Sequence, residues 1–329
     1  MNNSNSILDL IIASKKIVIS SHISPDADAI GSEVALCLAL QQLGKDVKII
    51  NPGNHSANLQ FLINHFSEGT YSYFNSKLTE FDCDLVIIVD TSQRKQFESV
   101  ANFILKSNAT IICIDHHLNP DDLFHHQHID TTLPATGILI YNLISKFPNF
   151  KLTLPIAESL YAAIMTDTGS FRFTRITGMV HEIIAKLVDA GANPSLIYEH
   201  IYETGSIQRL HLLGKALQSI QLWHNQKTSV ITITKNDFEE TKTSTEDLDN
   251  VVNFGFTIKG VDVSLMIVQL NDNFKMSFRS KGNFPANKLA QHFGGGGHLN
   301  AAGARYKANS LETVLNELKS KTKELYNSI

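Results

Sequence analysis

The chain of 329 residues is poor in cysteine, in positive charge and in long apolar runs. Its cysteines, Cys37, Cys83 and Cys113, form no CxxC pair, and we expect them to be reduced structural thiols in a cytosolic setting. A formal net charge of -4 gives the chain no overall positive charge with which to bind long nucleic acid. Any nucleic-acid substrate should therefore be short or bound at a local site. Residues 1–5 lack a leader pattern, and no apolar run approaches the roughly 18 residues that span a bilayer. We therefore expect a soluble, cytoplasmic protein that binds no membrane.

Length and hydrophobic content predict two domains. Hydrophobic residues make up 43% of the chain, which is enough for two cores of ordinary size. Apolar strand-like runs alternate with helical patterns in the first part, which predicts an α/β domain at 1–190 with a parallel sheet and helices on both faces. We expect a helical connector at 191–222 and a smaller α/β domain at 223–329. The active site is expected in the cleft between the two domains.

Hydrophobic periodicity assigns elements along the chain. The first domain should have strands at 17–21, 46–50, 85–89 and 110–114, and helices at 29–43, 56–65, 94–105, 136–145, 155–166 and 177–190. The second should have strands at 229–234, 261–269 and 274–279, and helices at 236–253, 285–292, 298–303 and 310–327. His125, His126 and His128 have no strand context and are expected in a solvated loop.

Acids and imidazoles follow four apolar, strand-like runs. Asp115, His116 and His117 come directly after the run 109–114. The other runs are 17–21, 85–89 and 160–166, the last within the helix expected at 155–166, and their polar residues are His22, Asp26, Asp28, Asp90 and Asp167. Because α/β proteins keep their active sites at the carboxyl edge of the sheet, these side chains should converge there.

Taken singly, these residues have ordinary explanations. Asp90 before Thr91 is typical of a helix cap, and Asp167 with Thr168 and Gly169 is typical of a turn. Because acids or histidines follow all four apolar runs, a metal site is favoured. Clustered carboxylates and imidazoles would repel and lose solvation without a cation, and mixed oxygen and nitrogen ligands suit Mn²⁺, Mg²⁺ or similar divalent ions.

The candidate ligands are too many for one ion. They are His22, Asp26, Asp28, Asp90, Asp115, His116 and Asp167. Two metal ions about 3.5–4 Å apart would use the surplus, with one carboxylate bridging them and a shared hydroxide as nucleophile.

A second motif is the glycine run 294–297, which precedes His298. Four glycines usually mean a surface loop, but they also let backbone amides approach an anion closely at a helix start. Cationic or polar residues flank the run, namely Arg279, Ser280, Lys281, His298 and Arg305. We therefore favour phosphate or substrate binding here.

With these motifs in order, the chain resembles the DHH phosphoesterase superfamily, named for the triplet at 115–117. Residues 278–280 and 294–304 look like the DHH-associated domain. Within the superfamily the chain is similar to the bifunctional nanoRNase (oligoribonuclease)/pAp phosphatase group. Members of that group degrade short oligoribonucleotides to mononucleotides and remove the 3'-phosphate of 3'-phosphoadenosine 5'-phosphate (pAp), usually with Mn²⁺.

The resemblance implies two divalent ions, Mn²⁺ ahead of Mg²⁺ or Co²⁺. One would be held by His22, Asp26 and Asp90, and the other by Asp28, Asp90, His116 and Asp167. Asp90 would bridge the metals, Asp115 would orient the histidine ligand, and His117 would meet the scissile phosphate as donor or acid. The residues implied to bind the substrate in the second domain are Arg279, Ser280, Gly296, Gly297, His298 and Arg305.

Other functions remain open. A cyclic dinucleotide or linear pApA phosphodiesterase of the same superfamily would share every metal ligand. A pyrophosphatase fits the glycine-rich second domain less well, and an exonuclease for long single-stranded DNA would carry extra domains and a basic surface. A non-catalytic nucleotide-binding protein would need a lost ligand position, and all six are intact. The sequence leaves the oligomeric state open, a homodimer included.

Overall fold

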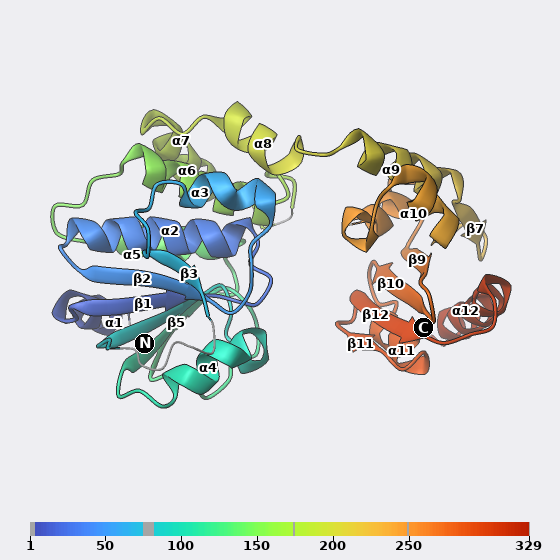
Figure 1. Ribbon diagram of the computed structural model, residues 1–329, viewed down its shortest axis with the longest axis horizontal. Coiled ribbons are helices and arrows are strands. Elements are labelled where there is room, and N and C mark those ends of the chain that lie inside the picture. The colour runs from blue at the N-terminus through green and yellow to red at the C-terminus, as the bar shows by residue number, and fades with distance from the viewer. Residues whose placement is uncertain (1–3, 75–81, 174, 249, 329) are drawn as a thin grey trace. The chain divides into compact units, whose positions relative to one another are not determined.

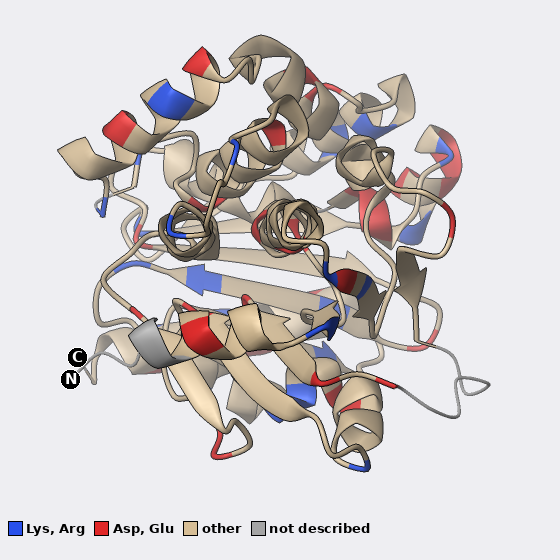
Figure 2. Cartoon of the chain, turned by 90° about the vertical axis from the view of Figure 1, so that its left-hand side faces the viewer, with Lys and Arg blue, Asp and Glu red and all other residues tan. Residues whose placement is uncertain are grey.

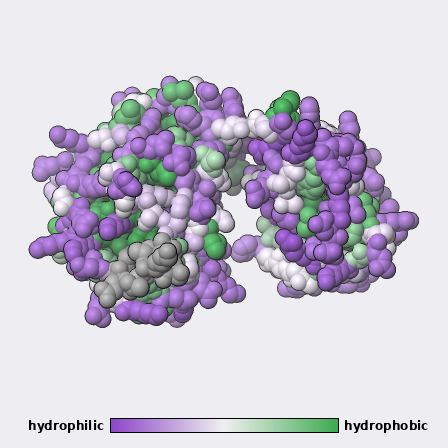
Figure 3. All heavy atoms as spheres, in the orientation of Figure 1, coloured by the Kyte–Doolittle hydropathy of each residue, from purple (hydrophilic) through white to green (hydrophobic). Residues whose placement is uncertain are grey.

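The computed structural model describes residues 4–74, 82–173, 175–248 and 250–328. The chain divides into two compact units, Met1–Thr204 and Gly205–Ile329 (Figure 1). Within the described residues, no helix is both long and apolar enough to cross a membrane. Basic and acidic residues are interspersed on the helices seen in Figure 2, and the surface seen in Figure 3 is mainly hydrophilic.

The first unit is built on a six-stranded sheet with the order β3-β2-β1-β4-β5-β6, in which all neighbours are parallel. Its strands are β1 (Lys16–Ser20), β2 (Asp46–Asn51), β3 (Tyr71–Tyr73), β4 (Leu85–Val89), β5 (Thr110–Asp115) and β6 (His126–Ile129). The direction of the strand order reverses at β1. In such sheets the crevice beyond the carboxyl ends of the strands, at the reversal, is the usual ligand site.

Helices cover both faces of this sheet, as the sequence predicts. They are α1 (Ser4–Ala13), α2 (Ala27–Gln42), η1 (Ala57–Leu59), α3 (Gln60–Ile63), η2 (Arg94–Phe97), α4 (Glu98–Ile104), α5 (Thr136–Ile144), α6 (Leu154–Asp167), α7 (Gly178–Asp189) and α8 (Pro194–Tyr202). Ile17 and Ile87 pack into a core shared with α2, α5 and α6. Their neighbours Val18 and Val86 point to the other face and pack with α4.

Helices α2 and α6 lie in close contact. A Cβ atom at Gly31 would lie 2.3 Å from the carbonyl oxygen of Ser159, so only glycine permits this approach. The contact fixes the end of α6, which carries Asp167, against the helix whose first turn carries Asp28.

The second unit holds a mixed sheet with the order β11-β12-β10-β9-β8-β7, in which only β8 and β9 are parallel neighbours. Its elements are α9 (Ile207–Gln218), β7 (Gln221–Trp223), β8 (Thr228–Ile233), α10 (Lys235–Thr241), η3 (Thr245–Leu248), η4 (Val251–Thr257), β9 (Val263–Gln269), β10 (Phe274–Ser280), α11 (Ala286–His292), β11 (Gly296–Gly297), β12 (Ala301–Tyr306) and α12 (Leu311–Tyr326). Apolar clusters pack on both faces of this smaller α/β unit.

Several sequence expectations were wrong. The run 160–166, which is also grouped with the strand ends, lies in α6, so the helix expected at 155–166 is confirmed and the strand-like interpretation is wrong. The helix expected at 236–253 is divided among α10, η3 and η4. His126 and His128 lie in the half-buried strand β6 rather than in a solvated loop. A strand of polar residues at the edge of a sheet leaves no apolar run to detect.

The helix expected at 298–303 does not form, because residues 298–300 connect β11 to β12 and residues 301–303 begin β12. A Cβ atom at Gly295 would lie 2.1 Å from the carbonyl oxygen of Gly303. The small residues here therefore serve close approach between chain segments, which overrides the helix preference of alanine. In the described residues, a strand stands where the helix start that could bind an anion was expected.

Candidate metal centre and phosphate pocket

The loop after β1 delivers the first ligands. Pro25 precedes Asp26, which is the N-cap of α2, and the Asp26 Oδ1 accepts hydrogen bonds from the backbone N–H groups of Asp28 (3.0 Å) and Ala29 (3.1 Å). This cap turns the chain so that Asp28, two residues later, is fully buried.

The first turn of α5 holds two buried carboxylates, those of Asp28 and Asp90. The backbone N–H groups of Thr136 and Gly137 donate to Oδ2 (2.7 Å) and Oδ1 (2.8 Å) of Asp28, and the Thr136 hydroxyl donates to Asp90 Oδ1 (2.8 Å). Burial, then the charge of Asp90, raises the pKa of Asp28 well above its usual range. Burial, then the charges of Asp26 and Asp167, does the same to the pKa of Asp90. A bound cation would relieve this repulsion.

Asp90 lies between two histidines. Its Oδ2 is 3.6 Å from Nε2 of His22, and its Oδ1 is 3.6 Å from Nε2 of His116. Asp90 itself follows β4 with a φ of 58°, a left-handed conformation that is uncommon outside glycine. Each oxygen of this one carboxylate therefore faces a different imidazole.

His116 has the hydrogen bonding expected of a metal ligand. Its Nδ1 donates to the carbonyl oxygen of Leu133 (3.2 Å), which leaves the lone pair on Nε2. That Nε2 is buried without a hydrogen-bond partner in the described part of the chain, and it lies 3.1 Å from Asp167 Oδ2 and 3.9 Å from Asp28 Oδ2. A bound cation would give this buried nitrogen a partner and would also offset the negative charge of the surrounding carboxylates.

The predicted ligands therefore form two groups. The ligand atoms of His22, Asp26 and Asp90 lie within 4.8 Å of one another, and so do those of Asp28, His116 and Asp167. Since Asp90 also borders the second group, the residues present fit two divalent cations with a shared carboxylate.

Asp115 contacts both histidines of the triplet, and its Oδ1 accepts the backbone N–H of His116 (2.8 Å). Its Oδ1 accepts a hydrogen bond from Nδ1 of His117 (2.8 Å), whereas Leu133 holds the ring of His116. The half-exposed His117 is thus the imidazole that Asp115 orients.

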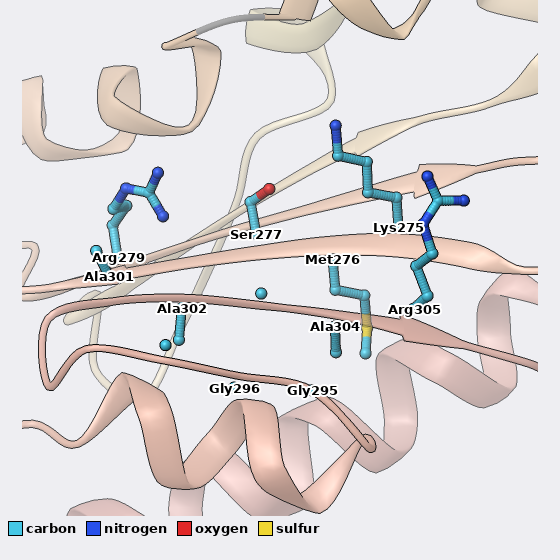
Figure 4. A pocket seen from close by; sticks show the side chains of 12 residues that line it. Lys275, Met276, Ser277, Arg279, Gly295, Gly296, Ala301, Ala302, Ala304 and Arg305 are labelled. Carbon is cyan, nitrogen blue, oxygen red and sulfur yellow. The ribbon is translucent and has the colours of Figure 1, made fainter. Parts of the chain in front are cut away.

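Four of the six candidate substrate residues of the second unit line an open pocket of about 580 Å³. Figure 4 shows Lys275, Ser277, Arg279 and Arg305 on one side of β10 and β12. Gly296 and Gly297 also line this pocket.

The other two predicted residues, Ser280 and His298, lie outside the lining, as far as the structure describes it. Ser280 faces the buried side of β10, where its hydroxyl donates to the carbonyl of Phe284 (2.7 Å). The alternation along a strand explains the difference, because residues 275, 277 and 279 share one face. Sequence reasoning missed Lys275 and Ser277. The alternation of side chains along a strand would have placed them on the same face as Arg279.

Sequence reasoning also missed Leu133, Thr136 and Gly137. They act through backbone atoms and one hydroxyl, and their only sequence signal is their place at the start of an expected helix, where free N–H groups attract anions.

Two family models match the chain. Residues 16–164 match the model of the DHH family, N-terminal domain, and residues 226–324 match the DHHA1 domain. Over 311 residues the chain is 29% identical to the bifunctional oligoribonuclease and PAP phosphatase NrnA of Bacillus subtilis, covering 94% of this chain and 95% of that one.

A protein of the same description from Thermus thermophilus is 30% identical over 300 residues, covering 90% of this chain and 86% of the relative. Among solved structures, an exopolyphosphatase-related protein from Bacteroides fragilis superposes with a TM-score of 0.88 at 28% identity, covering 98% of this chain and 97% of that one.

Proposed function

The chain belongs to the DHH family, and we propose that it is a metal-dependent phosphoesterase acting on short nucleotides. It would hydrolyse oligoribonucleotides of a few residues to 5'-mononucleotides and remove the 3'-phosphate of pAp. The observation that carries the proposal is the pair of ligand groups that meet at Asp90, with the buried Nε2 of His116 lacking a partner among the described residues. The relatives named oligoribonuclease and PAP phosphatase support the choice of substrate.

The metal ligands would be His22, Asp26 and Asp90 for one cation, and Asp28, Asp90, His116 and Asp167 for the other. Bound divalent ions supply Lewis acidity towards phosphoryl oxygens and lower the pKa of water. We propose Mn²⁺ as the native ion, since mixed imidazole and carboxylate ligands suit it, with Mg²⁺ or Co²⁺ as alternatives.

The protein's own acid would be His117. Because Asp115 binds its Nδ1, the ring nitrogen left to interact with a substrate oxygen is Nε2. From there it would donate a hydrogen bond to the phosphate, or a proton to the leaving 3'-oxygen. Both proposed activities break the bond between phosphorus and a nucleoside 3'-oxygen, so one acid serves both.

The pocket of the second unit would bind the substrate phosphate that is not held at the metal centre. Three cations, Lys275, Arg279 and Arg305, line it, and each can bind a phosphate oxygen. A cationic lining of this kind suits an anionic ligand.

We also propose that the protein works in a reducing compartment such as the cytoplasm. Cys37 and Cys113 are buried, and all three cysteines are free. Burial raises the pKa of Cys83 to about 11, which disfavours the reactive thiolate.

A substrate panel tests the proposal. The purified protein with Mn²⁺ is incubated with a 5'-phosphorylated diribonucleotide, pAp, cyclic di-AMP, pyrophosphate and a long single-stranded RNA, and initial rates are compared. We expect the diribonucleotide and pAp to be hydrolysed fastest. Fastest turnover of cyclic di-AMP would replace the proposed substrate with a cyclic dinucleotide, and equal cleavage of long RNA would overturn the preference for short substrates.

A further inference from the structure

The turn that follows the metal ligand Asp167 has an unusual backbone. Gly169, Ser170 and Phe171 have consecutive positive φ angles of 58°, 55° and 64°. Two of the three are not glycine, and residues other than glycine rarely adopt a positive φ angle. Strained backbone of this kind persists only where its surroundings hold it, and it is concentrated at functional sites.

Buried Thr168 holds the turn. Its hydroxyl donates to the carbonyl of Ile164 (2.6 Å) and accepts from the backbone N–H of Phe171 (3.1 Å). Its carbonyl accepts from the N–H groups of Arg172 (3.0 Å) and Phe173 (3.1 Å). The backbone of the turn is therefore fixed directly to the end of α6.

The two phenylalanines of the turn differ. Phe171 is half-buried and packs against the rings of Tyr161 (6.1 Å between centroids) and His181 (5.8 Å). The side chain of Phe173 is 58% exposed, although ring atoms of Phe173 lie 2.5 Å from the position that a Cβ of Gly169 would occupy. One side of the Phe173 ring thus rests on Gly169, two residues from a metal ligand, while much of the ring remains open to water.

Exposed apolar side chains also accompany the other ligand loops. Ile23, directly after His22, is 53% exposed, and Leu118, directly after His117, is 63% exposed. A single exposed apolar residue needs no explanation, but here each of three ligand-bearing loops carries one. Apolar groups around a strongly charged centre suit a ligand with an anionic part and an apolar part.

We propose that Phe173 is a stacking site for the nucleobase of the nucleotide whose phosphate is bound at the metal centre. This inference rests on the proposed function, which supplies the nucleotide. Stacking tolerates any base, because every base has a π face. Arg172 lies in the same turn, where its Nε donates to the carbonyl of Gly169 (2.8 Å), and places a cation beside the expected position of the anionic ligand.

A kinetic test compares pAp with ribose 3,5-bisphosphate, which has the same phosphates and no base. In Phe173→Ala the ratio of kcat/KM for pAp to that for the base-free compound should fall about tenfold, whereas Phe173→Trp should keep it. The ratio does not depend on the fraction of active enzyme, so poor folding of the variant cannot mimic the result. An unchanged ratio in Phe173→Ala would overturn the stacking site.

The matched control is Leu105, which is 45% exposed at the end of α4. It precedes the amino end of β5, whereas the metal ligands lie beyond the carboxyl ends of the strands. Leu105→Ala should leave the ratio unchanged.

Fluorescence gives a readout that needs no turnover. With Mn²⁺ present, AMP should quench the added tryptophan of Phe173→Trp, and ribose 5-phosphate should not. Leu105→Trp should respond to neither ligand. Equal responses of the two variants to AMP would contradict the proposal.

The same measurements separate this inference from the proposed function. If the wild-type protein hydrolyses base-free phosphoesters as well as pAp, the nucleotide function fails whatever the variants do. If it prefers pAp and Phe173→Ala retains that preference, only the stacking site fails.

Discussion

Asp115 Oδ1 lies 2.8 Å from Nδ1 of His117 and also accepts the backbone N–H of that residue (3.2 Å). One oxygen therefore fixes both the ring and the peptide of His117. Burial alone would raise the pKa of Asp115, but the hydrogen bond and charge of His117 outweigh it and lower that pKa. The hydrogen bond to Asp115 in turn raises the pKa of His117.

Replacing Asp115 with asparagine should reduce kcat by roughly 10²- to 10⁴-fold, the usual contribution of a general acid, because an amide no longer stabilises the cationic ring of His117. The metal content should stay at two ions, since Asp115 holds a ring that is not assigned to a metal. Elemental analysis and pH–rate profiles check both points. A variant that loses metal would mean that Asp115 supports the ligands after all.

Asp90→Ala should abolish hydrolysis of the diribonucleotide and of pAp together. Its two oxygens face His22 and His116, so both cation sites lose a ligand at once. Metal content measured after desalting should fall from two ions to one or none. Asp122→Ala, which removes an exposed acid, is the control and should behave as the wild type. One activity surviving near the wild-type rate would refute the bridging role.

Gly137→Ala should weaken both stability and metal binding. A Cβ at this position would lie 2.8 Å from the Cβ of Ala163 and 3.3 Å from Asp28 Oδ1. Overpacking of this kind costs about 1–3 kcal/mol, and it would move an N–H donor away from Asp28. Urea unfolding and Mn²⁺ titration measure the two effects.

The matched control is Gly178→Ala, in the first turn of α7, where a Cβ would have no neighbour within 4 Å among the described residues. It should match the wild type or gain up to about 1 kcal/mol from helix propensity. If both alanine variants behave alike, the close contact at Gly137 has no energetic consequence.

A buried carboxylate behind the site gives a pH prediction. Glu33, fully buried on α2, accepts a hydrogen bond from Asn51 Nδ2 (2.8 Å), and Asn51 Oδ1 accepts the backbone N–H of Ser21 (3.1 Å), the residue before His22. Burial, opposed by the hydrogen bond from Asn51, raises the pKa of Glu33 from 4.5 to about 7.

Because the folded-state pKa is the higher one, the folded protein binds this proton more tightly than the unfolded chain does. The resulting stability is full below pH 4.5 and is lost as the pH rises through about 7. Glu33→Gln should therefore be more stable than the wild type by roughly 3 kcal/mol at pH 8, and by less than about 1 kcal/mol at pH 5.

Urea unfolding of the metal-free proteins at both pH values measures this difference, with the exposed Glu98→Gln as a control that should show no such trend. Equal stability of Glu33→Gln and wild type at pH 8 would show that Glu33 ionises normally.

The sequence predicted the parts of the site that depend on residue type. Sequence reasoning grouped Asp28, Asp90 and Asp167 because acids follow several apolar runs of one chain, and the structure places all three near Nε2 of His116. It could not predict that Leu133 orients His116, because a backbone carbonyl has no signature in the sequence. The same limit applies to the N–H groups of α5 that hold Asp28.

The second unit shows a different limit. The alanines at 301 and 302 favour a helix by local propensity, but pairing with β10 and the close approach of Gly295 place them in β12. Ser280 likewise stands next to Arg279 in sequence, but adjacent residues of a strand face opposite sides.

The close packing of α2 on α6 has a consequence for folding. Asp28 and Asp167 belong to these two helices, and their partner His116 follows a strand of the sheet below, so the ligand set is complete only when both layers are docked. A cation bound there would hold the helix layer and the sheet together, because the two helices could not separate without releasing the ion. Loading with metal should thus merge the helix layer and the sheet edge into one cooperative unit of amide hydrogen exchange.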